Sequence, residues 1–274
     1  MMRIQTLLFR TALLAVVALG SQNLPAAELH PWTVQAWDAY VKATEKRIAA
    51  ELTGDKFLVI DSLGGGKSRA ARSAIRSGQV FVEKLETRND QDRDFAVKDG
   101  MIHHWLGAIF MPGIHLDTLL QWLQNYDQHE KYFDEIEKSK LLSRNGGEFK
   151  IFFRIRRKKI ITVYYNTEHT ALYRQHDATR ASSRSVATRI AELDDPGTPK
   201  EREKPHSDDS GFLWRLNSYW RFQQENGGVV VECESISLSR SIPAGFGWLI
   251  RGYAESVPRE SLQNTLNSIR EGVR

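Results

Sequence analysis

The chain has 274 residues, of which 41% are hydrophobic and 10% aromatic, which is enough to bury one sizeable core. Its 38 basic residues are nearly balanced by 34 acidic ones, and a net charge of +4 on this length does not by itself indicate nucleic-acid binding. The single cysteine, Cys233, excludes an intramolecular disulfide and a multi-cysteine metal site. Its place among valines predicts a buried, unreactive thiol.

The first 27 residues have the pattern of a secretory signal peptide. Two arginines lie near the start, an apolar run covers residues 12–19, and small residues at 18–20 and 25–27 provide cleavage sites. The apolar run is shorter than the roughly 20 residues that a transmembrane helix needs, although an uncleaved anchor is the alternative. We therefore expect the mature protein to be exported and to be periplasmic or secreted.

Residues 28–78 are expected to form an N-terminal helical extension. Apolar residues at helical spacing within residues 33–52 predict a helix that packs on the domain from outside and carries no evident chemistry. The glycines before Lys67 and Ser68 resemble a phosphate-binding loop, but Asp61 stands where that motif requires its first glycine. We therefore interpret this segment as a flexible turn that leads into a second helix.

From residue 79 onward the pattern changes to strands. Alternating polar and apolar residues, joined by short turns, predict an antiparallel meander. A short amphipathic helix over residues 116–123 interrupts the strands, and a charged, proline-containing loop covers residues 194–210. The predicted strands are residues 79–87, 101–111, 140–143, 148–156, 160–169, 171–176, 182–193, 212–222 and 229–234.

The chain is predicted to end in an amphipathic helix over residues 258–273. Leu262, Leu266 and Ile269 recur at helical spacing and form one apolar face. Pro258 suits the first turn of such a helix. The apolar face must pack on a sheet, and the strand at residues 212–222 offers apolar side chains at its even positions.

This order of elements resembles the helix-grip fold of the START/SRPBCC superfamily, which includes the birch-pollen allergen. Residues 119–142 are similar to the helix, aspartate-to-tyrosine and strand segment of START, coenzyme Q-binding and polyketide cyclase-like members. Residues 211–220 and 242–249 also resemble runs in exported bacterial members of the group. The resemblance implies an α+β fold in which residues 79–274 form a curved antiparallel sheet wrapped around the long C-terminal helix.

The resemblance also implies a hydrophobic cavity between sheet and helix that holds a lipid, sterol, quinone or polyketide. Apolar clefts of this kind are common ligand sites. For each residue on the apolar faces, plain core packing is the alternative. The candidate ligand-binding residues are Phe153, Ile155, Tyr165, Trp214, Trp220, Phe222, Leu262 and Leu266. The glycine-rich segment 242–252 is either a mobile gate, able to touch a membrane surface, or an irregular buried connection.

Three groups of polar residues suggest functions other than the binding of an apolar ligand. His103 and His104 are adjacent on a predicted strand and point to opposite faces, so they cannot chelate one ion, and neither a metal site nor a cofactor is expected. Glu232 and Glu234 share a strand face, which is either a catalytic pair inside the cavity or a solvated ion-pairing face. The basic residues 154–159 form either a solvated hairpin tip or a contact to anionic headgroups, and nucleic acid is not expected.

Three hypotheses of function follow. The first is an exported, non-enzymatic carrier that binds a hydrophobic ligand by apolar burial. The second is a cyclase- or aromatase-like enzyme that uses a carboxylate or histidine in the cavity. The third is an interaction protein with a filled core. A cavity carboxylate with a raised pKa would favour the enzyme, and a missing cavity would favour the interaction protein.

Overall fold

The computed structural model describes residues 28–158, 162–205, 208–241 and 247–273, and the side chains from residue 256 onward in the last of these ranges. The expected signal peptide and the first part of the expected gate, residues 242–246, lie outside the described residues. Among the helices that are described, none has the length and apolar character that crossing a bilayer requires.

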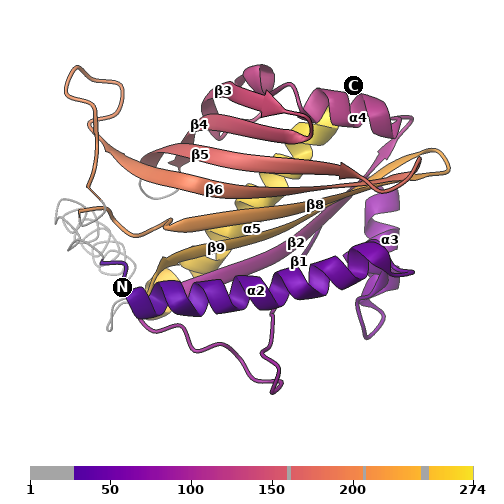
Figure 1. Ribbon diagram of the computed structural model, residues 1–274, viewed down its shortest axis with the longest axis horizontal. Coiled ribbons are helices and arrows are strands. Elements are labelled where there is room, and N and C mark those ends of the chain that lie inside the picture. Colours follow the sequence, from indigo (N-terminus) through magenta and orange to yellow (C-terminus); the bar gives the residue numbers. More distant parts are fainter. Residues whose placement is uncertain (1–27, 159–161, 206–207, 242–246, 274) are drawn as a thin grey trace, which may run out of the picture.

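The described residues form a nine-stranded antiparallel sheet with helices on both faces (Figure 1). The strand order is β1-β2-β9-β8-β6-β5-β4-β3, and the short β7 pairs with β6. The strands are β1 (Phe81–Lys84), β2 (Gly100–Pro112), β3 (Ile136–Asn145), β4 (Glu148–Lys158), β5 (Thr162–Gln175), β6 (Arg180–Asp194), β7 (Arg202–Glu203), β8 (Arg215–Glu225) and β9 (Gly228–Arg240). The helices are α2 (Pro31–Thr53), η1 (Val59–Asp61), α3 (Lys67–Arg76), α4 (Leu116–Leu123), η2 (Tyr126–Lys131) and α5 (Gly247–Gly272).

The two long helices lie on opposite faces of the sheet. In Figure 1, α2 crosses in front of the strands and α5 runs behind them. We call the face under α2 the outer face, to which Glu232, Glu234 and Ile236 of β9 point, and the opposite one the inner face, to which Cys233 and Ser235 point. Strand alternation thus gives every central strand one side toward each helix.

The outer face is covered by a helix whose apolar residues recur at helical spacing. Trp37, Tyr40 and Ile48 of α2 are buried against Ile236 and Leu238 of β9. Residues 57–60 and helix α3 extend this layer over the second half of β2. The segment that the sequence analysis treated as an extension therefore packs along the sheet.

The C-terminal helix covers the inner face unevenly. Helix α5 packs most closely on β2 and then on β9. Contact with β2 is tight, because a Cβ atom on Gly107 would lie 2.5 Å from Cδ1 of Leu266 and 3.0 Å from Cδ2 of Leu262. The absence of a side chain at Gly107 therefore seats the helix at this side of the sheet.

The helix-grip fold and the predicted order of strands and helices are confirmed, and two local predictions are wrong. The described residues of the two predicted strands 160–169 and 171–176 form one strand, β5, which pairs continuously with β4 over residues 162–172 and pairs with β6 up to Gln175. Helix α5 begins at Gly247, so Pro258 lies inside it and removes one backbone donor instead of marking its first turn.

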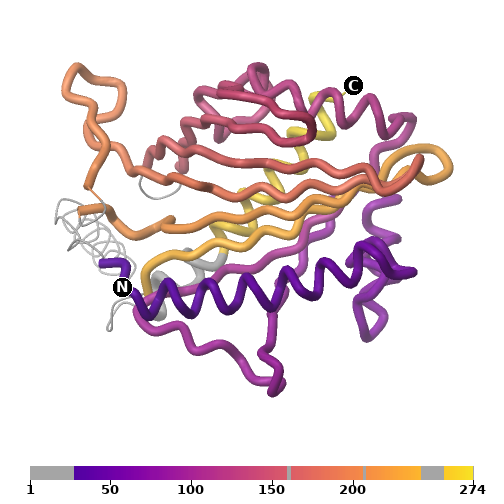
Figure 2. Tube along the Cα trace, viewed as in Figure 1, coloured from indigo at the N-terminus to yellow at the C-terminus, as the bar shows by residue number. Residues whose placement is uncertain are grey.

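Two hairpin turns meet at one end of the sheet. Figure 2 shows the β5–β6 and β8–β9 turns side by side. The backbone N–H of Gln224 donates to the carbonyl of Thr179 at 2.7 Å, which joins them. This end of the sheet is therefore held by backbone hydrogen bonds between turns.

Candidate functional site

A row of serines crosses the middle of the inner face. Ser185 of β6 is directly opposite Ser218 of β8, which is opposite Ser235 of β9, and Trp105 of β2 ends the row. Neighbouring strands lie about 4.8 Å apart, so the three hydroxyl-bearing positions span roughly 10 Å. Small side chains in the centre of a sheet leave space that leucine or isoleucine would otherwise fill.

A second row, next to the serines, combines aromatic and small side chains. Trp220 of β8 is opposite Cys233 on one side and Ser183 on the other, and Ser183 is opposite Tyr173 of β5. Tyr173 shares a hydrogen bond with Tyr126, with 2.9 Å between the phenolic oxygens. Burial raises the pKa of Tyr173 to about 12, so this phenol stays protonated at neutral pH.

The inner face keeps accessible surface where the outer face is sealed. Trp105, Trp220 and Ser218 are only half-buried, although they lie on the central strands. On the outer face of the same strands, Arg221 and Glu234 are 2% and 1% exposed. Beside the serine row, the side of the sheet that faces α5 is therefore less completely covered than the side under α2, whereas Ile109, Phe222 and Leu266 farther along the same face are fully buried.

The two inner-face histidines are neutral. His103 Nε2 lies 2.9 Å from Ser239 Oγ, and His169 Nε2 lies 3.0 Å from Thr167 Oγ1. Burial lowers the pKa of both imidazoles to about 4, with a further contribution from a nearby lysine at His103. They therefore act near neutral pH as hydrogen-bonding groups without charge. No set of three or more potential metal ligands is found among the described side chains.

The structure divides the predicted ligand-binding residues into several groups. Trp220 and Phe222 stack with their ring centroids 6.2 Å apart on the inner face. Phe153 lies among Tyr126, His129 and His169, farther along that face. The remaining inner-face positions are Ile155 and Tyr165 on β4 and β5, and Leu262 and Leu266 on α5.

Trp214 lies on the other side of the sheet. It packs with Trp37 and Tyr40 of α2, and its indole N–H donates to Asp209 Oδ1 at 3.1 Å. The prediction that Trp214 lines the same face as Trp220 is therefore wrong. Alternation fails because β8 begins only at Arg215, and Leu213 takes the inner-face position instead.

The outer face holds a buried charge cluster that sequence reasoning missed. Glu234 Oε1 lies 2.7 Å from His104 Nε2 and accepts a hydrogen bond from Arg47 of α2. The other ring nitrogen of His104 is 2.7 Å from the Tyr40 hydroxyl. Burial opposes ionisation of Glu234, but the hydrogen bond to His104 and the charges around it lower its pKa to about 2.

Arg221 joins this cluster to two further segments. Its guanidinium donates to the Phe57 carbonyl at 2.8 Å and to Glu51 Oε2 at 2.5 Å, and it lies 3.9 Å from Glu234 Oε2. Glu51 also accepts two hydrogen bonds from Arg47, at 2.9 and 2.8 Å. Arg221 and Arg47 are thus the arginines that pair with Glu51 and Glu234.

Glu232 anchors the segment around η1. Its two carboxylate oxygens accept hydrogen bonds from the backbone N–H groups of Val59 and Ile60, both at 2.8 Å. Burial raises the pKa of Glu232 to about 7, although the charge of Arg221 and the two backbone donors act against this shift. Glu232 and Glu234 are therefore neither cavity residues nor solvated: they are buried under α2 and η1.

Two sequence signals could have indicated this cluster. The pattern Glu232-Cys-Glu234 places two carboxylates in an otherwise apolar strand, and Arg47 and Glu51 form an i,i+4 pair on the predicted helix. Only the tertiary packing of α2 shows that these charges meet. The helix predicted to carry no evident chemistry thus supplies half of the cluster.

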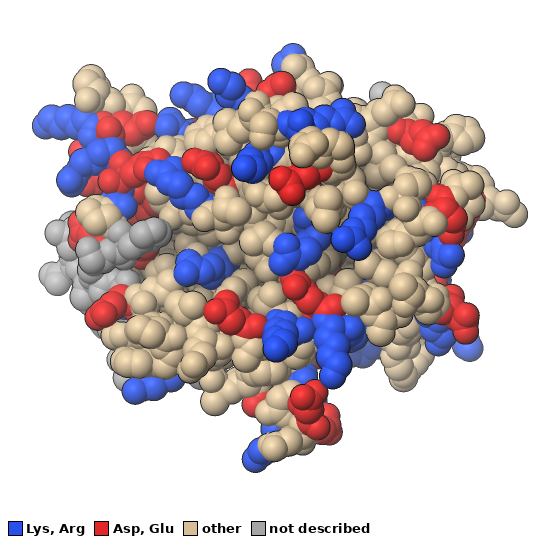
Figure 3. Space-filling view, viewed as in Figure 1, with Lys and Arg blue, Asp and Glu red and all other residues tan. Residues whose placement is uncertain are grey.

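Acidic partners neutralise much of the basic run at residues 154–159. Arg154 pairs with Glu201, and Arg157 pairs with Glu135, at 2.5 and 2.9 Å. In Figure 3, basic and acidic side chains are interspersed on the face that bears α2. This mixed surface favours a solvated hairpin over a dedicated site for anionic headgroups.

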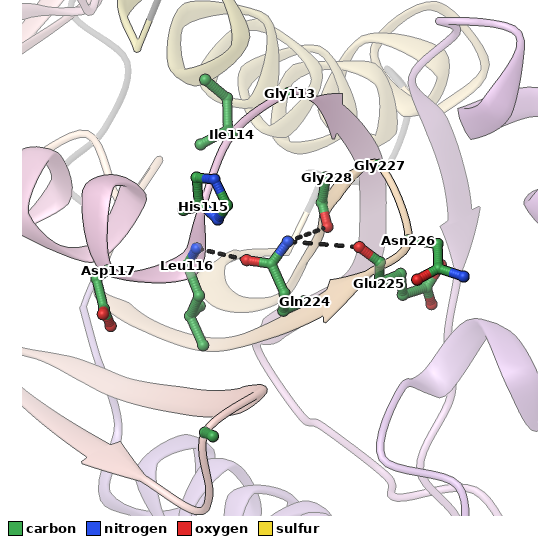
Figure 4. A pocket seen from close by; sticks show the side chains of 11 residues that line it. Gly113, Ile114, His115, Leu116, Asp117, Gln224, Glu225, Asn226, Gly227 and Gly228 are labelled. Carbon is green, nitrogen blue, oxygen red and sulfur yellow. Dashed lines mark hydrogen bonds between the residues drawn. The ribbon is translucent and has the colours of Figure 1, made fainter.

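A surface pocket lies at the end of the sheet where the turns meet (Figure 4). It is lined by the turns around residues 113–117 and 224–228 and by Ala178. Gln224 spans it: Oε1 accepts from the Leu116 N–H at 2.7 Å, and Nε2 donates to the Gly228 carbonyl at 2.8 Å. These hydrogen bonds fix the start of α4 to the β8–β9 turn, which gives the pocket a structural explanation.

The fold and the inner face together define a helix-grip protein. Similar solved structures include a STAR-related lipid transfer protein from Xanthomonas axonopodis, with 14% identity and a TM-score of 0.45 over 70% of this chain and 98% of that one. The chain is also similar to human STARD10, with 11% identity and a TM-score of 0.43 over 69% of each chain.

A third similar structure is the Zhui aromatase/cyclase from Streptomyces, with 11% identity and a TM-score of 0.42 over 63% of this chain and 94% of that one. No protein-family model matches the chain, and no curated protein matches its sequence. The assignment of the fold therefore stands on the sheet order and the position of α5 described above.

Proposed function

We propose that the protein is an exported, non-enzymatic carrier that holds a hydrophobic ligand between the inner face and α5. The observation that carries this proposal is the accessible aromatic surface in the middle of the sheet, formed by Trp105, Trp220 and Tyr173. Apolar surface in contact with water costs about 25 cal/mol per Å², so aromatic side chains at the centre of a sheet favour an occupant.

The distribution of charge supports binding over catalysis. The two buried carboxylates of β9, Glu232 and Glu234, point away from the inner face. His103 and His169 do face inward, but a pKa of about 4 makes each a weak base at neutral pH. A cyclase-like reaction that uses one of these histidines is the second candidate, since His169 lies beside Phe153 on the inner face.

Export is part of the proposal because of the N-terminal sequence. Residues 1–27 combine early arginines, a short apolar run and small residues before a possible cleavage point. A carrier of this kind would collect its ligand during brief contact with a membrane surface. The outer face would meanwhile keep the sheet stable through its buried ion pairs.

The test is native mass spectrometry of the protein purified without detergent from the envelope of its own host, followed by lipid extraction. We expect a stoichiometric adduct of one lipid class. Recovery of the protein from the envelope, with a shortened N-terminus, would support export. A mass that stays bare after incubation with a host lipid extract would refute the carrier and leave the enzyme and interaction hypotheses.

A further inference from the structure

The serine row presents hydroxyl groups that the protein itself does not use. Among the described residues, the side chains of Ser185, Ser235 and Ser237 make no hydrogen bond. Ser218, between the first two, bonds only to the thiol of Cys233. Ser185, Ser218 and Ser235 are also half-buried, so part of each side chain remains accessible. Unused hydroxyls in such a position are available to a ligand.

The other described polar groups that β2, β5 and β9 present on the middle of the inner face are neutral too. Thr167 is paired with the uncharged His169, and Ser239 with the uncharged His103. The charged side chain of Glu192 lies toward the end of this face, where it is occupied by Lys204 and the hydroxyl and N–H of Ser210. Among the described side chains, Lys84 of β1 lies beyond Trp105 at one end of the serine row. Strands β6, β8 and β9 therefore offer hydrogen bonds around Ser185 and Ser218 without a charged side chain of their own at these positions.

The side chains of the inner face determine which ligands can bind without a large loss of hydration free energy. A hydroxyl group donates one hydrogen bond and accepts others, so it matches hydroxyl, ester or ketone oxygens. Beside Ser185 and Ser218, an ionised carboxylate or phosphate would lose its hydration without gaining a charged partner from β6 or β8, which is far more costly than burying a neutral polar group. Trp105 and Trp220 flank the serines and provide flat apolar surfaces for the body of the ligand.

We infer that the ligand is an uncharged lipid whose hydroxyl or carbonyl oxygens lie along Ser185, Ser218 and Ser235. This inference rests on the proposed carrier function and narrows it to neutral amphiphiles. It disfavours free fatty-acid anions of the same chain length. The apolar part of the ligand would lie against Trp105 and Trp220.

Two probes that differ in charge test the inference. Equilibrium binding of radiolabelled 1-monopalmitoylglycerol and of palmitate is measured at pH 8, below the concentration at which either aggregates. The purified protein is compared with a triple variant, Ser185→Ala, Ser218→Ala and Ser235→Ala. The control is Ser143→Ala, on the exposed part of β3. Circular dichroism checks that each variant is folded.

The glycerol ester should bind saturably and at least about tenfold more tightly than palmitate. The triple variant should weaken ester binding by about tenfold, because two or three neutral hydrogen bonds are lost, while the control should not change it. Equal or tighter binding of palmitate would overturn the inference and leave the carrier function standing, as would an unchanged affinity of the folded triple variant. If neither probe binds and the host lipid extract leaves the mass bare, the carrier function fails and the inference fails with it.

Discussion

The two faces of the central strands differ in the charge and in the accessibility of their side chains. Under α2 the sheet carries Arg221, Glu232 and Glu234, all nearly inaccessible and all tied to other segments. Opposite α5 the same strands carry serines and half-buried tryptophans without a described countercharge. Successive residues of β9 therefore belong to different layers, because strand side chains alternate between the face under α2 and the face toward α5.

The buried layer under α2 explains how part of the inner face can keep accessible surface. A fold with an incompletely filled face needs stability from elsewhere, since cavities and small side chains forfeit packing contacts. Here the layer formed by α2 and residues 57–60 supplies apolar burial, and its buried charges fix the position of those segments. Variants on the outer face should therefore change stability, and variants on the inner face should change binding.

The largest effect is expected for Arg221→Met. This change removes the fully buried cation from Glu51 and Glu234, which keep the half-buried Arg47, and it removes the donor to the Phe57 carbonyl. Removing one member of a buried ion pair costs about 3 to 5 kcal/mol, which urea unfolding at pH 7 would measure. Arg184→Met is the matched control, since Arg184 is half-exposed, pairs with Glu45, and should cost under about 1 kcal/mol. A similar small cost at both positions would contradict a central role of the outer cluster.

A pair of tryptophan variants sharpens the comparison. Trp37→Ala removes a buried ring from α2 and should lower the free energy of unfolding by about 3 kcal/mol or more, with ligand binding unchanged. Trp220→Ala should cost less stability but weaken binding at least about tenfold, because apolar contact with the ligand is lost. Urea unfolding and lipid binding are measured on both variants. Lower stability with unchanged binding in Trp220→Ala would identify it as core packing.

Glu232 gives the outer face a distinct pH dependence. Its folded pKa of about 7 exceeds its ordinary value of 4.5. Its contribution to the free energy of unfolding is therefore fully present below pH 4.5 and is lost as the pH rises through 7. The shift corresponds to a loss of up to about 3 kcal/mol across this window. Glu232→Gln should therefore flatten the stability profile between pH 4.5 and 8 relative to the parent protein. Parallel profiles for the two proteins would show that Glu232 does not titrate in this range.

The buried inner-face histidines should give the free energy of unfolding the opposite dependence on pH. Because His103 and His169 have pKa values near 4 instead of 6.5, their contribution is present above pH 6.5 and is lost as the pH falls toward 4. His169→Gln should reduce the loss of stability on acidification, as followed by urea unfolding at pH 7, 5.5 and 4.5. If the variant lost as much stability on acidification as the parent protein, titratable groups other than His169 would cause that loss.

Much of the fold could be predicted from the sequence, because periodicity is a local property. Alternation identified the strands, and the spacing of Leu262, Leu266 and Ile269 identified the last helix. The predicted start at Pro258 is wrong because proline usually marks a first turn, whereas here the helix continues through Pro258 despite the backbone hydrogen bond that proline cannot make. Trp214 was misplaced because parity holds only within a regular strand, and β8 begins after it.

The site was less predictable, because it depends on which face meets which helix. Parity placed Glu232 and Glu234 on one face but could not show that α2 covers it. The serine row depends on the register of three strands. It aligns Ser185, Ser218 and Ser235 only after the β8–β9 hairpin has formed and β8 has paired with β6 across the long connection between them. The aromatic side chains of these strands stand out in the sequence, whereas the serines between them carry no local signal of a site.

The most direct test of the account fills the space beside the serine row with Ser218→Leu. Native mass spectrometry of the variant, purified from the envelope beside the parent protein, reads out the bound ligand, and urea unfolding reads out stability. The account predicts a folded variant within about 1 kcal/mol of the parent that carries no lipid adduct, since a leucine occupies free space. A retained adduct, or a loss of several kcal/mol that reveals an already filled core, would contradict it.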